Sequence, residues 1–273
     1  MEQLIYKPTV KLVGRPAFLG IPEEMGEPRK NHPEKPDQDV GTEAERLFET
    51  AGRVCYDSYG KGRGSESYHE HIQEVGHGSI SEHGMWSFYL GGISRGLSHE
   101  LVRHRVGVGI SQRSTRYVDE NESGWIVPPL YQITDGEDSR IAAMKLECQD
   151  LLNRARGECA EIYGKLVGYG QDILKATTDI KLTPRRKMAR GAARSVLGQA
   201  LDVQMIWSAN LRTLLHVCNM RCTQFAESEI RVLFRKITEL MVLESPSYFG
   251  NVEFRPSPDG LGPEIVPGTL ARI

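Results

Sequence analysis

The chain has 273 residues, of which 39% are hydrophobic and 26% charged, and its formal net charge is −2. These values are typical of a soluble globular protein and exclude wholesale disorder, collagen-like repeats and a long coiled coil. The near-neutral balance also argues against a polybasic protein that binds nucleic acid or membranes with its whole surface.

The N-terminal sequence and the cysteines bear on localisation. The first residues hold no apolar stretch of signal-peptide length, and no window approaches the roughly 20 apolar residues of a membrane span. The five cysteines form no CxxC pair, which is typical of reduced thiols. We therefore expect a cytoplasmic protein without a membrane-spanning segment.

The N-terminal part of the chain changes character at residue 42. Residues 1–41 are predicted to form an irregular arm, because five prolines and many charges lie between positions 14 and 41. Thr42 and Glu45 form a capping-box pattern ahead of a helix, and a second short helix is expected from Ser67 to Val75.

The remaining elements follow from hydrophobic periodicity. It predicts, in order, a strand at 84–93, a helix at 94–105, an extended segment at 108–118, a long helix at 138–167, a strand at 200–208 and helices near 210–220 and 224–243. Thr183 is expected to cap another helix that starts at Pro184. The Pro- and Gly-rich tail, residues 245–273, is expected to lie extended.

This mixture of elements predicts the α+β class. We expect a central, largely antiparallel sheet flanked by long helices, in a single domain with irregular N- and C-terminal arms. The predicted domain spans residues 42–244.

The densest chemical signal lies in residues 101–118, which hold four arginines and neither an acid nor a lysine. Arginine presents a planar fork of donors that suits phosphate. Gly107 and Gly109 allow a close backbone approach, and the hydroxyls of Ser114 and Thr115 add donors. The pattern favours binding of a small anion, and a solvated basic loop is the alternative.

A second acid-free stretch spans residues 180–201. Arg186, Arg190 and Arg194 are spaced four residues apart and would share one face of a helix starting at Pro184. Further along, Arg212 and His216 share a helix face for the same reason.

Four histidines invite a metal interpretation. His69, His71, His77 and His83 lie close together in the sequence, but their spacing matches no strong zinc pattern. We therefore expect no metal site.

Four blocks of the chain together resemble the flavin-dependent thymidylate synthase family. The family hallmark is an RHR triplet, seven residues and a serine, similar here to Arg103-His104-Arg105 and Ser114-Thr115-Arg116-Tyr117. The other blocks are Arg53-Val54-Cys55-Tyr56, then His77-x-Ser79-x-x-Glu82-His83, and then Asn210-x-Arg212 with His216, Arg221 and Glu229-Ile230.

One departure from the family pattern is visible. Eight residues rather than seven separate Arg105 from Ser114, which implies a one-residue insertion near Gly107–Gly109. The insertion leaves open whether Gln112 or Arg113 fills the position before the serine.

The resemblance implies an activity and its partners. The reaction is the reductive methylation of dUMP to dTMP, with methylenetetrahydrofolate as carbon donor and NADPH-reduced, non-covalent FAD as hydride source. The family assembles as a homotetramer whose active sites are shared between subunits, with no nucleic-acid or membrane partner.

The resemblance also implies roles for individual residues. FAD would be held by Ser79, Arg103, His104, Arg105, Gln112, Asn210, Arg212 and His216. The dUMP would be held by Glu100, Arg103, Gln112, Arg113, Ser114, Thr115, Arg116 and Arg221, and by Arg194 from another subunit. Arg221 is the expected catalytic residue, because its charge would stabilise negative charge on the uracil ring.

Three alternatives stay open on the sequence. A nucleic-acid-binding protein would use the two basic stretches, and a metal-dependent hydrolase would use the four histidines. The third is a family member that keeps the fold but has lost activity through the insertion.

Overall fold

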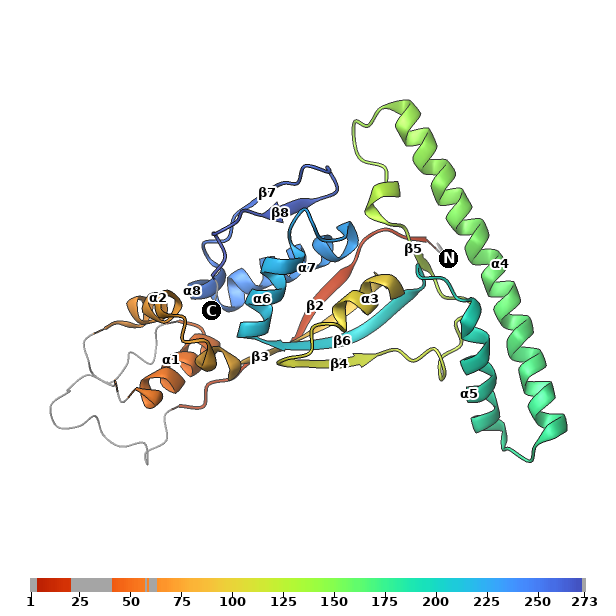
Figure 1. The fold of residues 1–273 in the computed structure, drawn as a ribbon, viewed down its shortest axis with the longest axis horizontal. Helices are drawn as coiled ribbons and strands as arrows, with labels where there is room; N and C mark the ends of the chain where they lie inside the picture. Colours follow the sequence, from red (N-terminus) through yellow and green to blue (C-terminus); the bar gives the residue numbers. More distant parts are fainter. Residues whose placement is uncertain (1–3, 21–40, 57, 59–62, 272–273) are drawn as a thin grey trace. The chain divides into compact units, whose positions relative to one another are not determined.

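The computed structural model describes residues 4–20, 41–56, 58 and 63–271 (Figure 1). Residues 21–40 of the predicted irregular arm lie outside the described residues. The arm is not irregular throughout, because residues 4–5 and 9–14 form strands, and residues 9–14 pair into the largest sheet. The strands are β1 (Leu4–Ile5), β2 (Thr9–Gly14), β3 (Met85–Ser94), β4 (Val108–Gln112), β5 (Trp125–Ile126), β6 (Asp202–Asn210), β7 (Phe254–Pro256) and β8 (Pro263–Ile265). The helices are α1 (Glu43–Cys55), α2 (Ser65–Val75), α3 (Arg95–Leu101), α4 (Ser139–Thr177), α5 (Leu182–Ala193), α6 (Leu211–Arg221), α7 (Ser228–Glu244) and α8 (Pro246–Phe249), with 3-10 turns η2 (Gly78–Glu82), η3 (Pro129–Tyr131) and η4 (Arg194–Val196).

The largest sheet has four strands in the order β2-β3-β6-β4 and is antiparallel. Two smaller sheets pair β1 with β5 in parallel and β7 with β8 antiparallel. The α+β class predicted from the sequence, with an antiparallel sheet and long helices, is confirmed.

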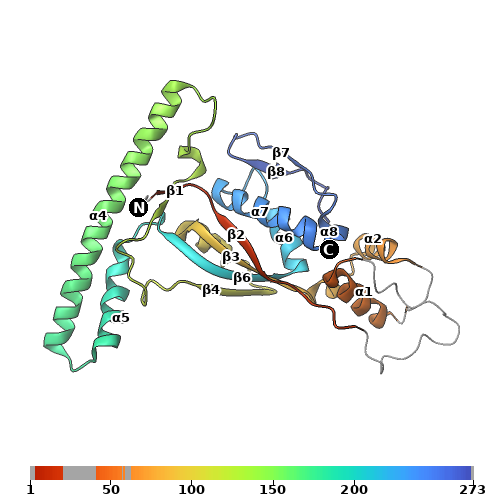
Figure 2. The same ribbon diagram turned by 180° about the vertical axis from the view of Figure 1, so that it is seen from behind.

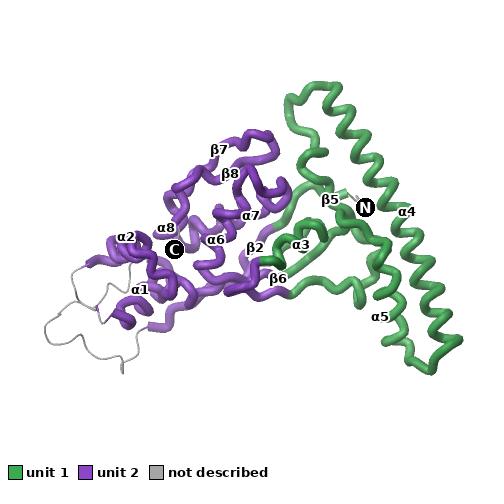
Figure 3. The backbone as a smooth tube through the Cα atoms, viewed as in Figure 1, with its two compact units in different colours: residues 1–9, 90–103, 111–205 green, residues 10–89, 104–110, 206–273 purple. Residues whose placement is uncertain are grey.

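The chain divides into two compact units, each made from three separate segments (Figure 3). Unit 1 comprises residues 1–9, 90–103 and 111–205, and unit 2 comprises residues 10–89, 104–110 and 206–273. Strands β3, β4 and β6 each begin in one unit and end in the other. The division also falls inside the RHR triplet, so Arg103 belongs to unit 1 while His104 and Arg105 belong to unit 2.

Unit 1 contains the long helix α4, against which α5 lies in both views (Figures 1 and 2). The Asp138 side chain caps α4 by accepting hydrogen bonds from the backbone N–H groups of Arg140 (2.9 Å) and Ile141 (3.3 Å). Buried Tyr163 and Val167 of α4 pack on Ala193. The helix continues to Thr177, ten residues beyond the predicted end, although it contains glycines, which disfavour helix.

Unit 2 is built around aromatic side chains. The ring of Trp207 lies edge-on to Phe234 at 5.7 Å between centroids and stacks with Phe88 at 6.1 Å. The tail, predicted to lie extended, instead forms α8 and the β7–β8 hairpin beside α7 (Figure 2). Its buried Ile265 donates its backbone N–H to the carbonyl of Cys222 (2.8 Å), so the tail packs on its own chain.

Most predicted elements are confirmed, with shifted ends. The capping box of Thr42 and Glu45 is present, and both hydrogen bonds of the motif form. The helix predicted at 94–105 ends at Leu101, so the RHR triplet follows the helix instead of lying on it. Residues 113–118, predicted extended, form a turn after β4.

The predicted start of α5 is wrong. The N-cap is Lys181 rather than Thr183, and Pro184 is the third helical residue. Proline is tolerated there because the first turn of a helix has no internal partner for its N–H groups. Helix α5 ends at Ala193, and Arg194 is its C-cap residue with helical backbone angles (φ −58°, ψ −10°).

Within the described ranges, no helix is long and apolar enough to cross a membrane.

Candidate active site

The predicted site residues separate by unit. Unit 2 carries most residues expected to hold FAD: Ser79, His104, Arg105, Asn210, Arg212 and His216, together with Arg221. Unit 1 carries most residues expected to hold dUMP: Glu100, Arg103, Gln112, Arg113, Ser114, Thr115, Arg116 and Arg194.

Helix α6 presents two predicted side chains to solvent. Asn210 caps the helix, and its side-chain oxygen accepts a hydrogen bond from the Thr213 N–H (3.0 Å). Leu211, Leu214 and Leu215 are buried on one side of α6, whereas Arg212 and His216 are both exposed. The predicted common face of Arg212 and His216 therefore lies open to a ligand.

The segment 104–110 is tied to the start of α6. The Thr213 hydroxyl donates to the Val106 carbonyl (2.7 Å), and the Asn210 N–H donates to the Gly107 carbonyl (3.1 Å). Gly107 has a φ of +64°, and a Cβ there would lie 2.4 Å from Asn210 Nδ2. Only glycine fits this position, both for its backbone conformation and for its space.

His104 is joined to Arg221. The Nε of Arg221 donates to His104 Nε2 (3.0 Å), which requires the imidazole proton to lie on Nδ1. Burial, and then the nearby Arg221 and His216, lower the pKa of His104 to about 4. The imidazole is therefore neutral near pH 7, and the guanidinium beside it carries the positive charge.

Glu82 forms an ion pair with Arg212. The distance from Arg212 Nη1 to Glu82 Oε1 is 2.5 Å, and both side chains are about half exposed. Such an exposed pair adds little stability, but it orients the guanidinium. Glu82 lies on η2 with exposed Ser79. The sequence placed Glu82 in a motif without a role, and the structure supplies its partner.

The donors in unit 2 suit a dinucleotide cofactor. Ser79, Arg105, Arg212 and His216 are all exposed, and each can donate to phosphate oxygens. This donor set fits the pyrophosphate of FAD.

In unit 1 the residues Ser114–Val118 form a tight turn. The N–H groups of Tyr117 and Val118 both donate to the Ser114 carbonyl (3.1 and 3.0 Å). The Arg116 N–H points toward Ser114 Oγ (3.4 Å), and the Arg116 side chain is exposed. Thr115 is buried. Of the three predicted phosphate-binding side chains, Arg116 is the most open.

Helix α5 brings the second basic stretch onto this turn. Arg190 donates to the Tyr117 carbonyl (2.7 Å) and pairs with Asp119 (3.0 Å). Lys187 hydrogen bonds the Tyr117 hydroxyl and lies over its ring. The two acid-free stretches therefore meet in unit 1. The Arg190 guanidinium hydrogen bonds to the turn and to Asp119, so it supports the turn.

Arg113 and Gln112, the two candidates for the position before the motif serine, have different surroundings. The Arg113 guanidinium is paired with buried Glu120 at 3.0 Å. Gln112 closes β4 and is partly exposed. Glu100 lies on α3, while Arg103 and Arg194 are exposed.

Two cysteines next to Arg221 are poor nucleophiles. Cys218 and Cys222 are fully buried, and burial raises the pKa of each thiol to about 12. A protonated thiol is neither a good nucleophile nor a metal ligand.

The histidines of the metal interpretation do not converge. His69 is buried, and its Nδ1 lies 3.0 Å from the Tyr248 hydroxyl. Among the residues that the structure describes, no group of three His, Cys, Asp or Glu side chains could hold a metal ion.

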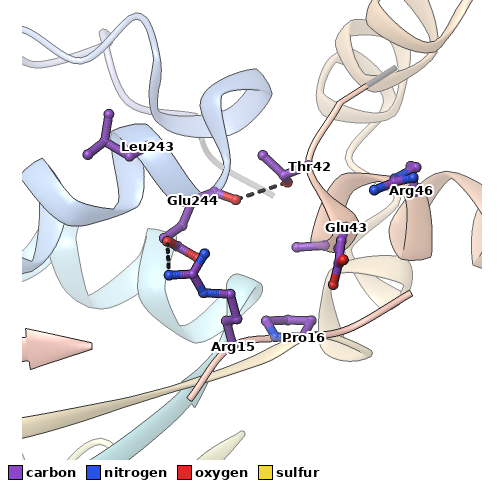
Figure 4. Close-up of a pocket in the computed structure, with 8 residues that line it drawn as sticks. Arg15, Pro16, Thr42, Glu43, Arg46, Leu243 and Glu244 are labelled. Atoms are coloured by element: carbon purple, nitrogen blue, oxygen red, sulfur yellow. Dashed lines mark hydrogen bonds and ion pairs between the residues drawn. The ribbon is translucent and has the colours of Figure 1, made fainter. Parts of the chain in front are cut away.

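A pocket in unit 2 contains none of the predicted residues (Figure 4). It lies where the ends of α1 and α7 meet Arg15 and Pro16. Glu244 accepts from the Thr42 hydroxyl through its backbone carbonyl (3.0 Å) and pairs with Arg15 through its carboxylate (3.3 Å). These contacts join the end of α7 to Arg15 and to the residue that caps α1.

Comparison with known proteins identifies the family of the chain. The model of the family described as "Thymidylate synthase complementing protein" matches residues 39–247. The chain is 38% identical over 233 residues to a flavin-dependent thymidylate synthase of Mycobacterium sp. (strain JLS), covering 82% of this chain and 87% of the relative. It is 36% identical over 239 residues to one of Mycobacteroides abscessus, covering 85% and 90% of the two chains.

A solved structure shares the fold. The chain resembles a UMP/dUMP methylase, PolB, from Streptomyces cacaoi bound with 5-Br dUMP, with a TM-score of 0.63 and 19% identity. The match covers 90% of this chain and 94% of that one.

Proposed function

The chain belongs to the flavin-dependent thymidylate synthase family, and we propose that it methylates dUMP to dTMP with its own arginine-rich site. The observation that carries this proposal is the hydrogen bond from Arg221 to His104. It joins the RHR triplet to the downstream motif block, 117 residues further along the chain.

FAD is the proposed cofactor, held without a covalent bond. The residues proposed to bind it are Ser79, Arg103, His104, Arg105, Gln112, Asn210, Arg212 and His216. When bound, a flavin that NADPH has reduced supplies the hydride. Methylenetetrahydrofolate is the proposed carbon donor.

The dUMP phosphate is the proposed ligand of the Ser114–Val118 turn. Arg116 offers an exposed guanidinium there, next to the partly exposed Ser114, while Thr115 is buried. Glu100, Arg103 and Gln112 would border the nucleotide, and Arg194 of another copy would complete the anion site. A fixed cluster of donors binds an anion well because little reorganisation is needed.

Arg221 is the proposed catalytic residue. Its Nε is occupied by the neutral His104, which orients the guanidinium without neutralising its charge. A positive charge fixed beside the uracil ring would stabilise the negative charge that develops during attack at carbon 5. The buried thiols of Cys218 and Cys222 are consistent with a route that needs no cysteine nucleophile.

A homotetramer is the proposed assembly. One face of α4 exposes seven large apolar side chains, each between 39% and 67% exposed: Ile141, Met144, Leu151, Ile162, Leu166, Tyr169 and Ile173. They recur three, four or more residues apart, as on one stripe of a straight helix. An apolar surface of this kind usually marks an interface. The free cysteines suit the reducing cytoplasm, the proposed location.

Flavin spectroscopy tests the proposed function. The purified protein, alone or after addition of FAD, should show a flavin absorbance spectrum. NADPH oxidation should then be stimulated by dUMP, and dTMP should form when methylenetetrahydrofolate is present. Failure to bind FAD would overturn the proposal. Normal FAD and dUMP binding without dTMP would instead favour a relative that has lost activity.

A further inference from the structure

Arg113, directly before Ser114, is tied to three oxygen atoms of unit 1. Its Nη2 donates to Glu120 Oε2 (3.0 Å), to the Ser123 hydroxyl (3.2 Å) and to the Asp202 carbonyl (3.0 Å). Its Nη1 lies 3.9 Å from the Asp202 carboxylate. The backbone N–H of Arg113 also donates to the Gln204 carbonyl (2.9 Å). Both the backbone and the side chain of this residue are therefore fixed.

The two acids that hold Arg113 are themselves held. Glu120 is 2% exposed and accepts a hydrogen bond from the Ser123 hydroxyl (2.5 Å). Asp202 is 8% exposed, and its carboxylate accepts from the Gly92 N–H (3.1 Å). The network thus connects the residue before Ser114 to β3, to β6 and to the 120–123 turn.

This geometry conflicts with a direct role for Arg113 in phosphate binding. If the guanidinium turned to a phosphate, Glu120 and Asp202 would stay buried without their cationic partner. An unpaired buried charge is strongly unfavourable. Arg113 therefore acts as a link between two buried acids and the turn, which leaves Gln112 for the ligand.

We propose that Glu120 and Asp202 are positioning residues for dUMP binding, which through Arg113 hold Ser114, Thr115 and Arg116 in the conformation that receives the phosphate. This inference rests on the proposed function. It assigns roles to two acids that no motif singles out, and it makes Arg113 a supporting residue.

The substitution Glu120→Gln separates the two roles of Arg113 by the sign of its effect. If Arg113 positions the turn, loss of the charged hydrogen bond should raise the KM for dUMP about tenfold, with kcat within twofold and the flavin spectrum unchanged. If Arg113 binds phosphate directly, Glu120→Gln frees the guanidinium, and the KM should stay the same or fall.

Two further variants complete the experiment. Glu122→Gln removes the same charge from an exposed position two residues away, and it should leave the KM unchanged. Ser123→Ala removes the hydroxyl that accepts from Arg113 and donates to Glu120, and it leaves both charged groups in place. It should raise the KM about threefold, which decides the question even if Glu120→Gln does not fold.

The outcomes separate the inference from the proposed function. If wild-type protein does not bind dUMP, the proposed function is wrong and the inference falls with it. If wild-type protein binds dUMP and both Glu120→Gln and Ser123→Ala match its KM, the positioning role is wrong while the function stands. If Glu120→Gln raises the KM for dUMP, and Glu120→Asp, which keeps the negative charge, raises it less, the positioning role is supported.

Discussion

The two parts of the candidate site are held in place by different forces. In unit 2 the segment 104–110 is fixed by the Asn210 cap, the Thr213 hydroxyl and the backbone of Gly107. In unit 1 the Ser114–Val118 turn is fixed by charged side chains, through Arg113 with its acids and Arg190 with Asp119. Neutral hydrogen bonds hold the 104–110 segment, whereas ion pairs add to the backbone hydrogen bonds of the Ser114–Val118 turn.

This difference decides what each part is sensitive to. Bonds to backbone carbonyls do not depend on salt or on the ionisation of side chains, so the 104–110 segment is vulnerable mainly to steric change. A turn held by charges loses support when one partner is neutralised, and salt weakens its exposed pair most. Four substitutions or measurements test this comparison, in order of decreasing effect.

The largest effect is expected from Arg221→Ala. This change removes the positive charge beside His104, and loss of one such donor commonly costs roughly 10²–10³ in rate. The protein should stay folded and keep its flavin spectrum, because Arg221 is only partly buried. The measurement is dTMP formation, with Arg235→Ala on α7 as a matched control. Near-wild-type turnover in Arg221→Ala would contradict its catalytic assignment.

Gly107→Ala should damage unit 2 through shape alone. The positive φ costs a residue with a side chain roughly 1–2 kcal/mol, and the new Cβ would meet the Asn210 side chain at 2.4 Å. We expect a lower melting temperature and weaker FAD binding. Gly109→Ala is the control, because its Cβ would lie at an ordinary 3.6 Å from Ser208. Equal effects of the two substitutions would refute the steric explanation.

Arg190→Ala should damage unit 1 through charge. It removes the bonds to the Tyr117 carbonyl and to Asp119, and the KM for dUMP should rise about tenfold, as expected for charged hydrogen bonds. FAD binding should not change. Arg186→Ala removes the same charge from an exposed position on α5 and should leave the KM unchanged. Titrations of dUMP into both variants at two salt concentrations check this prediction.

The smallest effect concerns pH and His104. Because the folded pKa of about 4 lies below the ordinary value of 6.5, the unfolded chain binds more protons between these values. The free energy of unfolding should therefore decrease as the pH falls from about 6.5 to about 4. In His104→Gln this part of the pH dependence should be flatter. Denaturant titrations at several pH values measure the difference, and identical slopes would show that His104 does not contribute.

Local signals in the sequence predicted much of the fold. The Thr42–Glu45 capping box, the apolar run of β3 and the periodicity of α4 each depend on residues close in the chain. The prediction for Thr183 failed because proline is tolerated throughout the first turn of a helix, so Pro184 does not fix the first helical residue. The tail was also mispredicted, since its hairpin forms against α7 and has weak local signals.

The candidate site divides in the same way. The order and spacing of the motif blocks identified the family without any structure, since the arginines, histidine and serine of those blocks can be recognised from the sequence alone. Nothing in the sequence revealed that Arg113 pairs with Glu120 and Asp202, because Asp202 lies 89 residues further along the chain. Similarly, only the folded chain shows His104 accepting from Arg221.

The sequence by itself determined the α+β class, the family and the set of side chains available for chemistry, because periodicity and motif spacing are properties of neighbouring residues. Only the tertiary structure decided which of those side chains face a ligand and which support others. That choice depends on burial and on partners distant in the chain. Burial keeps the imidazole of His104 neutral, so it accepts a hydrogen bond from Arg221. The buried acids pair with Arg113, so this arginine supports the turn, whereas Arg116 stays exposed.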